Sequence, residues 1–170
     1  MNRSKKIAII SHCIINQNSV VKGEYKDINI FFPFIKKLFE ENIGILQLPC
    51  PETECYGLRR WGYVKEQFDN CGYRKYVEKI INSFVDIIKE YINNEYEIVG
   101  IYGIAGSPSC GVNLTCSANW EGEISLYKDK EDIVSRVKMI NESGIFMEIF
   151  KSVLDKNKIN IPFYDVDDFI

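Results

Sequence analysis

Residues 96–106 read YEIVGIYGIAG, an apolar run that breaks at glycines, and this pattern predicts a buried β-strand. Three more short apolar runs end in turn-forming residues: KIAIISHC (6–13), IGILQLPC (43–50) and INIPFYDV (159–166). Continuous apolar runs are typical of parallel strands that are buried on both faces. The chain is therefore expected to form a parallel sheet.

Amphipathic segments separate these runs. INIFFPFIKKLFEEN (28–42) has apolar residues at helical spacing, and its Pro33 falls in the first turn, where proline is tolerated. YVEKIINSFVDIIKEYI (76–92) and ESGIFMEIFKSVLDK (142–156) each place apolar residues on one face of a helix. This alternation predicts an α/β fold, doubly wound, with right-handed crossovers that cover both faces of a mostly parallel sheet.

Length and composition indicate one domain. The chain has 170 residues, 46% of them hydrophobic, and shows neither a repeat nor a low-complexity linker, so residues 1–170 are expected to share one core. Ser11 and His12 interrupt the first apolar run, and no cleavage pattern follows. A membrane span needs about eighteen consecutive apolar residues, and none is present. We expect a cytoplasmic protein that neither spans nor binds a membrane.

The net charge is −3, which argues against a protein whose main task is to hold a nucleic-acid backbone. That task requires clustered lysine and arginine. The charge pattern gives no indication of oligomeric state.

Three of the six cysteines fall at corresponding places in the predicted sheet. Cys13 ends the first run, Cys50 ends the second, and Cys110 follows the third through a glycine-rich loop. The carboxyl ends of parallel strands meet at one edge, where such folds bind ligands. Cysteines of a cytosolic chain stay largely reduced, so these three are expected to converge as metal ligands or nucleophiles, with inert buried thiols as the alternative.

Three thiolates are soft ligands that suit zinc, copper(I) or an iron–sulfur cluster. The chain has no C-x-x-C pair, and ligands dispersed over three strand ends fit a cluster seated in the substrate crevice. An iron without a protein ligand would then be free for substrate, like the open position of a catalytic zinc. Spacing alone does not distinguish iron from zinc.

The neighbours of these cysteines add acid–base groups. Glu52 lies two residues after Cys50, in PCPE, where its carboxylate can act as a general acid or base. Ser107 lies in the loop GSPSCG beside Cys110, as a functional hydroxyl or as a turn former. His12 is the only histidine, which weakens a Ser-His or Cys-His hydrolase hypothesis, and a hydrogen-bonded supporting role is expected for it.

The segment TECYGLRRWGYVKEQFDNCG (53–72) has no strong period and is expected to be a long loop. Its aromatic rings and arginine side chains would stack on a flat heterocycle and close over it. The alternative is that the segment is an ordinary surface loop. These candidate substrate-binding residues are Tyr56, Arg59, Arg60 and Trp61. The remaining cysteines, Cys55, Cys71 and Cys116, are expected to be partly buried thiols, and Cys116 lies near enough to Cys110 to act as a resolving or alternative ligand.

The motifs SHC, PCPE, GSPSCG and GIFMEIF occur here in an order that resembles the thiouracil desulfidase (TudS-like) family over most of the chain. The resemblance implies one Rossmann-like desulfidase domain that holds a [4Fe–4S] cluster on Cys13, Cys50 and Cys110. The fourth iron would be open and would bind the sulfur of a thiolated base. Glu52 and Ser107 would assist while water replaces the sulfur, which leaves as sulfide.

The sequence departs from the family around the expected pocket. IINQNSVVKGEY (14–25) stands where members have a tyrosine–glycine pattern, and TECYGLRRWG (53–62) where they have a run like GGLP-PR. A small thiolated base such as thiouracil is the expected partner, and thiolated tRNA stays open as an alternative.

Two other functions remain open. A non-catalytic metal or cluster module, a sensor or carrier, would need the three cysteines but neither Glu52 nor Ser107. A flavodoxin-like thiol enzyme would use Cys13 as nucleophile, with Cys110 or Cys116 as the resolving thiol.

Overall fold

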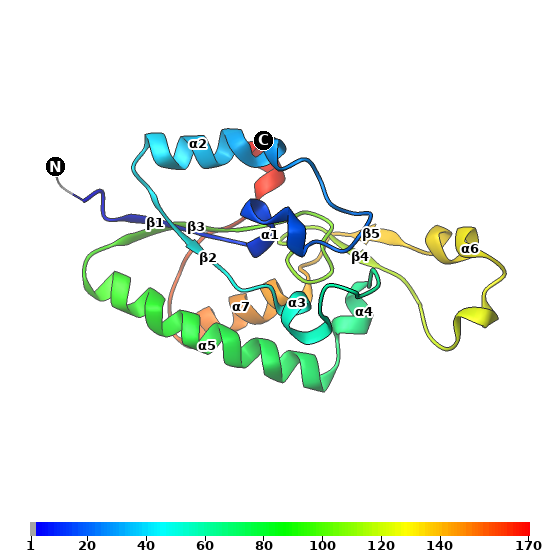
Figure 1. Ribbon diagram of the computed structural model, residues 1–170. Coiled ribbons are helices and arrows are strands. Elements are labelled where there is room, and N and C mark those ends of the chain that lie inside the picture. The colour runs from blue at the N-terminus through cyan, green and yellow to red at the C-terminus, as the bar shows by residue number, and fades with distance from the viewer. Residues whose placement is uncertain (1–2) are drawn as a thin grey trace.

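The computed structural model describes residues 3–170 and has a four-stranded parallel sheet at its centre (Figure 1). Its strands are β1 (Lys6–Ile10), β2 (Gly44–Gln47), β3 (Glu97–Gly103) and β6 (Phe163–Asp165), in the order β2-β1-β3-β6. All three pairings are parallel. This order matches flavodoxin-type sheets, whose direction of winding reverses between β1 and β3. The predicted α/β, mostly parallel, Rossmann-like or flavodoxin-like fold is confirmed.

Helices cover both faces of this sheet. Helices α5 (Cys71–Asn93) and α7 (Ile145–Lys156) lie below it in Figure 1, and α2 (Phe32–Glu40) lies above it. Side chains alternate along each strand, so Ile9 packs in the core between the sheet and helices α5 and α7. Ala8 and Ile10 pack in the core between the sheet and helix α2. The three predicted helices are confirmed, although residues Ile28–Phe31 form a 3₁₀ turn, η2, before α2 begins.

Short elements gather at the carboxyl edge of the sheet. They are α1 (His12–Ile15), η1 (Gln17–Ser19), α3 (Pro51–Tyr56) and α4 (Lys65–Phe68). The expectation of one long loop over residues 53–72 is therefore wrong, because the segment contains most of α3, all of α4 and the start of α5. Helices of four to six residues complete fewer than two turns, so no helical period shows in the sequence.

The first two strands end earlier than the sequence indicates. β1 stops at Ile10, and Cys13 lies in α1; β2 stops at Gln47, and Cys50 precedes α3. The cysteines thus sit in the turns that follow the strands.

A small arm was not predicted from the sequence. β4 (Thr115–Ser117) pairs antiparallel with β5 (Lys138–Ile140), and η3 (Ile124–Leu126) and α6 (Lys130–Ser135) lie between them. Figure 1 shows this arm extending away from the sheet on the side of the strand ends. Strands of three residues are too short to show an alternating pattern.

The last described segment returns to the α2 side as η4 (Val166–Phe169), where Phe169 packs on Phe34 and Tyr102. Among residues 3–170, no helix combines the length and the apolar character needed to cross a membrane.

Candidate functional site

A cavity of about 500 Å³ lies beyond the strand ends of β1, β2 and β3. Cys13, Cys50 and Cys110 all line it, and they come from α1, from the residue before α3 and from the loop after β3. Glu52 and Ser107 line it as well. The turns at the switch point of the sheet therefore bring together the three cysteines, the carboxylate and the hydroxyl that the sequence singled out.

Cys50 is fixed by the start of α3. Its Sγ accepts hydrogen bonds from the backbone N–H of Thr53, at 3.4 Å, and from Thr53 Oγ1, at 3.2 Å. The sulfur thus takes the place of the usual serine or aspartate oxygen at the helix N-terminus.

Cys110 is fixed by a tight loop. Its backbone N–H donates to Ser107 Oγ at 2.9 Å, and its carbonyl accepts from Ile104 N at 3.0 Å. A Cβ on Gly103 would lie 2.1 Å from that carbonyl oxygen, so the loop can close only over a glycine. Ser107 therefore shapes the cysteine turn, while its hydroxyl proton is still available to the cavity.

A buried carboxylate anchors the far side of the same loop. Asp165, at the end of β6, accepts from the backbone N–H groups of Val112 at 2.8 Å and Asn113 at 2.9 Å. Charge-assisted bonds of this kind are stronger than neutral ones. The loop that carries Cys110 is thus tied to the last strand of the sheet.

The thiols influence one another electrostatically. Burial, and then the charges of Cys50 and Glu52, raise the pKa of the Cys13 thiol to about 12. Burial, and then the charges of Cys13, Glu52 and Cys50, raise the pKa of Cys110 well above its ordinary value. A cation among these groups would lower the pKa of the Cys13 and Cys110 thiols and favour release of their protons.

The three cysteines give the cavity a soft donor set. Within the part of the chain that the structure describes, no three His, Cys, Asp or Glu side chains stand close enough to hold a single ion. A zinc ion needs each thiolate about 2.3 Å away from it. Three thiols that line one cavity are the kind of donor that zinc, copper(I) or an iron–sulfur cluster takes.

Glu52 is paired with Arg60 at the cavity wall. Arg60 Nε donates to Glu52 Oε2 at 3.2 Å, and the arginine side chain is 3% exposed. The same guanidinium donates to the carbonyls of Ser19, at 2.7 Å, and Gly57, at 3.1 Å. Burial raises the pKa of the Glu52 carboxyl, and Arg60 opposes this shift.

The predicted substrate-binding residues separate into two groups. Arg60 and Trp61 line the cavity, and Trp61 is 76% exposed. Arg59 is exposed and is not among the lining residues, and Tyr56 packs instead against Tyr63, Phe68 and Tyr73. Arg60 is committed to Glu52 and to backbone carbonyls, so it supports the site as part of its wall.

The remaining cysteines are reduced, and only one of them lines the cavity. Cys55 and Cys71 are exposed, whereas partial burial was expected. Cys116, at the base of the arm, is half-buried and lines the cavity, and its thiol donates to the Tyr63 carbonyl at 3.7 Å.

Sequence reasoning missed the contribution of the arm. Trp120, Val134, Val137 and Met139 from this segment form an apolar wall of the cavity. His12 also lines it, and its ring nitrogens contact the side-chain amides of Asn16 at 3.0 Å and Gln47 at 3.1 Å, as the expected hydrogen-bonded role requires. Nothing in the sequence separated the arm from an ordinary surface segment.

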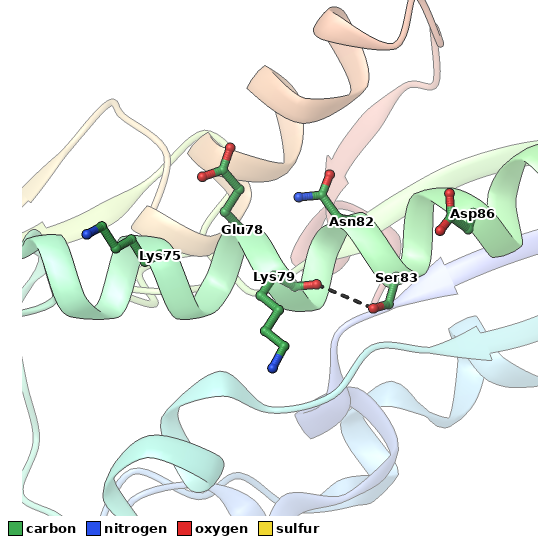
Figure 2. Close-up of a pocket in the computed structure, with 6 residues that line it drawn as sticks. All are labelled: Lys75, Glu78, Lys79, Asn82, Ser83 and Asp86. Atoms are coloured by element: carbon green, nitrogen blue, oxygen red, sulfur yellow. Dashed lines mark hydrogen bonds between the residues drawn. The ribbon is translucent and has the colours of Figure 1, made fainter.

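A second, shallow depression lies on α5. Figure 2 shows its lining side chains, Lys75, Glu78, Lys79, Asn82, Ser83 and Asp86, along the exposed surface of that helix. The charges are mixed, and no cysteine or aromatic ring is present. It has the character of a solvated helix face.

Comparisons with known proteins found a matching family model and a similar protein. A family model described as "Putative 2-thiouracil desulfurase" matches residues 5–168. An uncharacterized protein of Methanocaldococcus jannaschii is 37% identical over 110 residues, which cover 65% of this chain and 70% of that protein. No solved structure was found to match.

Proposed function

We propose, from the premise that the chain belongs to the family described as "Putative 2-thiouracil desulfurase", that it is an iron–sulfur-dependent desulfidase. It would hydrolyse the carbon–sulfur bond of a thiolated nucleobase and release sulfide. The observation that carries this proposal is the single cavity that Cys13, Cys50, Cys110, Glu52 and Ser107 all line. A sensor or carrier would need the cysteines but would have no use for a buried acid–base group beside them.

In this proposal Cys13, Cys50 and Cys110 hold a [4Fe–4S] cluster. When bound, the cluster supplies an open, Lewis-acidic iron that attracts the substrate sulfur and weakens its bond to carbon. The Thr53 donors at Cys50 and the tight turn at Cys110 hold two of the three sulfurs in place before any cluster arrives.

Glu52 is the group that handles protons. Its carboxylate takes a proton from the attacking water, whose oxygen forms the new bond to the ring carbon. The carbon–sulfur bond breaks, and the sulfur leaves as hydrogen sulfide with the two protons of the water, so nothing is oxidised or reduced. Arg60 holds the Glu52 carboxylate in place. The Ser107 hydroxyl donates a hydrogen bond to the substrate nucleobase.

The cavity wall supports a flat, uncharged substrate. Trp61, Tyr63 and Trp120 offer aromatic surface on which a heterocycle can stack. Among the described residues, only two cations line the cavity: Arg60, which is paired with Glu52, and Lys26, which is paired with Asp167. The wall therefore lacks the clustered lysine and arginine that a nucleic-acid backbone requires. A small thiolated base such as thiouracil fits this wall better than a polynucleotide.

The structure disfavours the competing thiol enzyme. A nucleophilic cysteine is a partly exposed thiolate with a lowered pKa. Burial and nearby negative charge instead raise the pKa of Cys13 to about 12. The proposal therefore gives Cys13 the role of a ligand.

Anaerobic reconstitution with iron and sulfide tests the proposal. The protein should bind one four-iron cluster and release sulfide from 2-thiouracil or 4-thiouracil. Replacement of Cys13, Cys50 or Cys110 by alanine should abolish both properties, whereas Cys71→Ala, at an exposed position, should keep them.

Two results would contradict the proposal. Stoichiometric zinc without iron uptake would exclude the cluster. A stable cluster without turnover on any thiolated base would favour the non-catalytic module.

A further inference from the structure

Every backbone carbonyl of the Cys110 loop, residues 108–112, accepts a hydrogen bond. Ile104 N donates to the Cys110 carbonyl at 3.0 Å, and the other four carbonyls are bonded from α7 and the two residues before it. The backbone donors there are Ile145 N to Pro108 O at 3.0 Å, Phe146 N and Met147 N to Ser109 O at 3.0 and 3.3 Å, and Gly144 N to Gly111 O at 2.9 Å. The first turn of a helix has free N–H groups, and here the loop satisfies them.

Lys151, in the second turn of α7, extends this contact to the last carbonyl of the loop. Its Nζ donates to the Val112 carbonyl at 3.0 Å and to Ser143 Oγ at 2.8 Å. Ser143 Oγ donates to the same Val112 carbonyl at 2.7 Å. On its other side, the Val112 N–H donates to Asp165 at 2.8 Å. The residue two positions after Cys110 is therefore held at both its N–H and its carbonyl.

Val112 does not need the lysine to have its carbonyl satisfied. The Ser143 hydroxyl already gives that carbonyl one donor, so the lysine is a second donor to the same oxygen. Lys151 is half-buried, and burial lowers the pKa of its amine, while the charge of Asp165 opposes this shift. Partial burial of a charge costs free energy. The explanation that remains is the geometry that Lys151 imposes on the loop.

We propose that Lys151 is a positioning residue that fixes the Cys110 sulfur at the cavity by holding the Val112 carbonyl. This inference rests on the proposed role of Cys110 as a cluster ligand. Cys110 is 8% exposed, so its thiol meets solvent mainly when the loop opens. With Lys151 in place the loop opens rarely. Without it, the loop opens more often, which exposes the thiol of the empty protein and weakens the hold on a cluster.

Lys151→Met keeps an unbranched side chain beside the Phe163 ring but removes the donor. In the protein without a cluster, a thiol reagent should modify Cys110 roughly tenfold faster in this variant, because loss of a charge-assisted hydrogen bond makes local opening more frequent. Cys71, which is exposed, should react at the same rate in both proteins. Mass spectrometry of the cysteine-containing peptides measures each rate.

The reconstituted protein gives a second readout. Under anaerobic conditions, Lys151→Met should lose iron to a chelator roughly tenfold faster than the parent. Lys151→Arg, which restores a charged donor, should recover most of the parent's behaviour in both measurements. Lys151→Gln has a neutral and shorter donor, so its Cys110 should also react faster than the parent's, even if the methionine variant does not fold.

Lys156→Met is the matched control. This lysine lies at the other end of α7, where its exposed amine pairs with Glu78 at 3.6 Å. The substitution removes the same charge from the same helix, so the labelling of Cys110 and the rate of iron loss should match those of the parent. An effect equal to that of Lys151→Met would assign the change to the charge of the helix and overturn the proposal.

The outcomes are distinct. If the parent takes up no cluster, the proposed function fails, while the labelling of Cys110 still decides whether Lys151 fixes the loop. If Lys151→Met and Lys151→Gln leave that labelling unchanged, or the loaded variants retain iron like the parent, only the inference fails. A variant in which Cys13 and Cys110 react faster by the same factor, with a lower melting temperature, would show that Lys151 supports the whole fold and has no specific role at Cys110.

Discussion

Arg60 offsets the free-energy cost of burying the Glu52 carboxylate in the cavity wall. The guanidinium is 3% exposed and donates to one carboxylate and to two backbone carbonyls. Removal of one partner of a buried ion pair leaves the other charge without compensation, which costs more than the pair contributes in place. At the scale of single residues, the stability of the cavity wall therefore depends on Arg60 as much as on Glu52.

Arg60→Ala should lower the free energy of unfolding by about 3 kcal/mol, because it strands the Glu52 carboxylate and frees the Ser19 and Gly57 carbonyls. Arg59→Ala, at the exposed neighbouring position, should change it by less than about 0.5 kcal/mol. Urea unfolding of both variants measures the difference. Equal effects at the two positions would show that the Arg60 contacts contribute nothing to stability.

Glu52→Gln keeps the size of the side chain but cannot carry the proton. The cluster should remain, since the glutamate is not a ligand in the proposed site, while turnover should fall by roughly 10²–10⁴-fold. Iron content and sulfide release from the same preparation report the two properties. Full turnover with an intact cluster would remove Glu52 from the mechanism.

The loop between β3 and the arm carries Cys110 and depends on the elements around it. Gly103 ends β3 in contact with the Cys110 carbonyl, and Asp165 at the end of β6 accepts hydrogen bonds from the backbone amides of Val112 and Asn113. Two adjacent parallel strands therefore determine where this sulfur lies. The position of the Cys110 sulfur thus depends on the sheet, and the sequence of the loop alone does not reveal it.

Gly103→Ala should displace the loop, because the new Cβ would lie 2.1 Å from Cys110 O and 2.8 Å from Val112 Cγ2. We expect a loss of about 1–3 kcal/mol in the free energy of unfolding and a large loss of bound iron. Gly62→Ala is the control, since a Cβ there meets nothing within 4 Å. Unfolding curves and iron analysis test both variants, and a Gly103→Ala protein with full iron would show that the turn is not needed.

The sequence predicted the elements that are long or strongly patterned. The four parallel strands and the helices α2, α5 and α7 were predicted because their apolar residues follow a clear period. The arm and the short helices α3 and α4 were missed because each is too brief to show one. The strand-end rule placed Cys13, Cys50 and Cys110 together, but it could not reveal Lys151, Asp165 or the ion pair of Arg60, since these depend on contacts between distant segments.

The whole molecule carries a net charge of −3, and the cations at its cavity are already paired. Binding to a polynucleotide weakens steeply as salt rises, because phosphate contacts release counterions. A small uncharged base has no such dependence. The net charge thus favours a free thiolated base over thiolated tRNA as the substrate.

Sulfide release from 2-thiouracil and 4-thiouracil should change little between 50 and 200 mM salt, whereas thiolated tRNA should be a poor substrate at either concentration. The measurement compares initial rates for the reconstituted protein on each substrate. Activity restricted to tRNA, with a steep loss at 200 mM salt, would overturn the small-molecule substrate.

The hydrogen bonds between Asp165 and the Cys110 loop also determine when this loop can form during translation. The first proposed ligand, Cys13, leaves the ribosome early, but the loop at Cys110 is not anchored until residue 165 has been translated. At ordinary translation speeds, this interval is on the order of ten seconds. A nascent chain therefore exposes the Cys13 thiol well before the loop of Cys110 is anchored, and a cluster held by the proposed ligands would be inserted after synthesis.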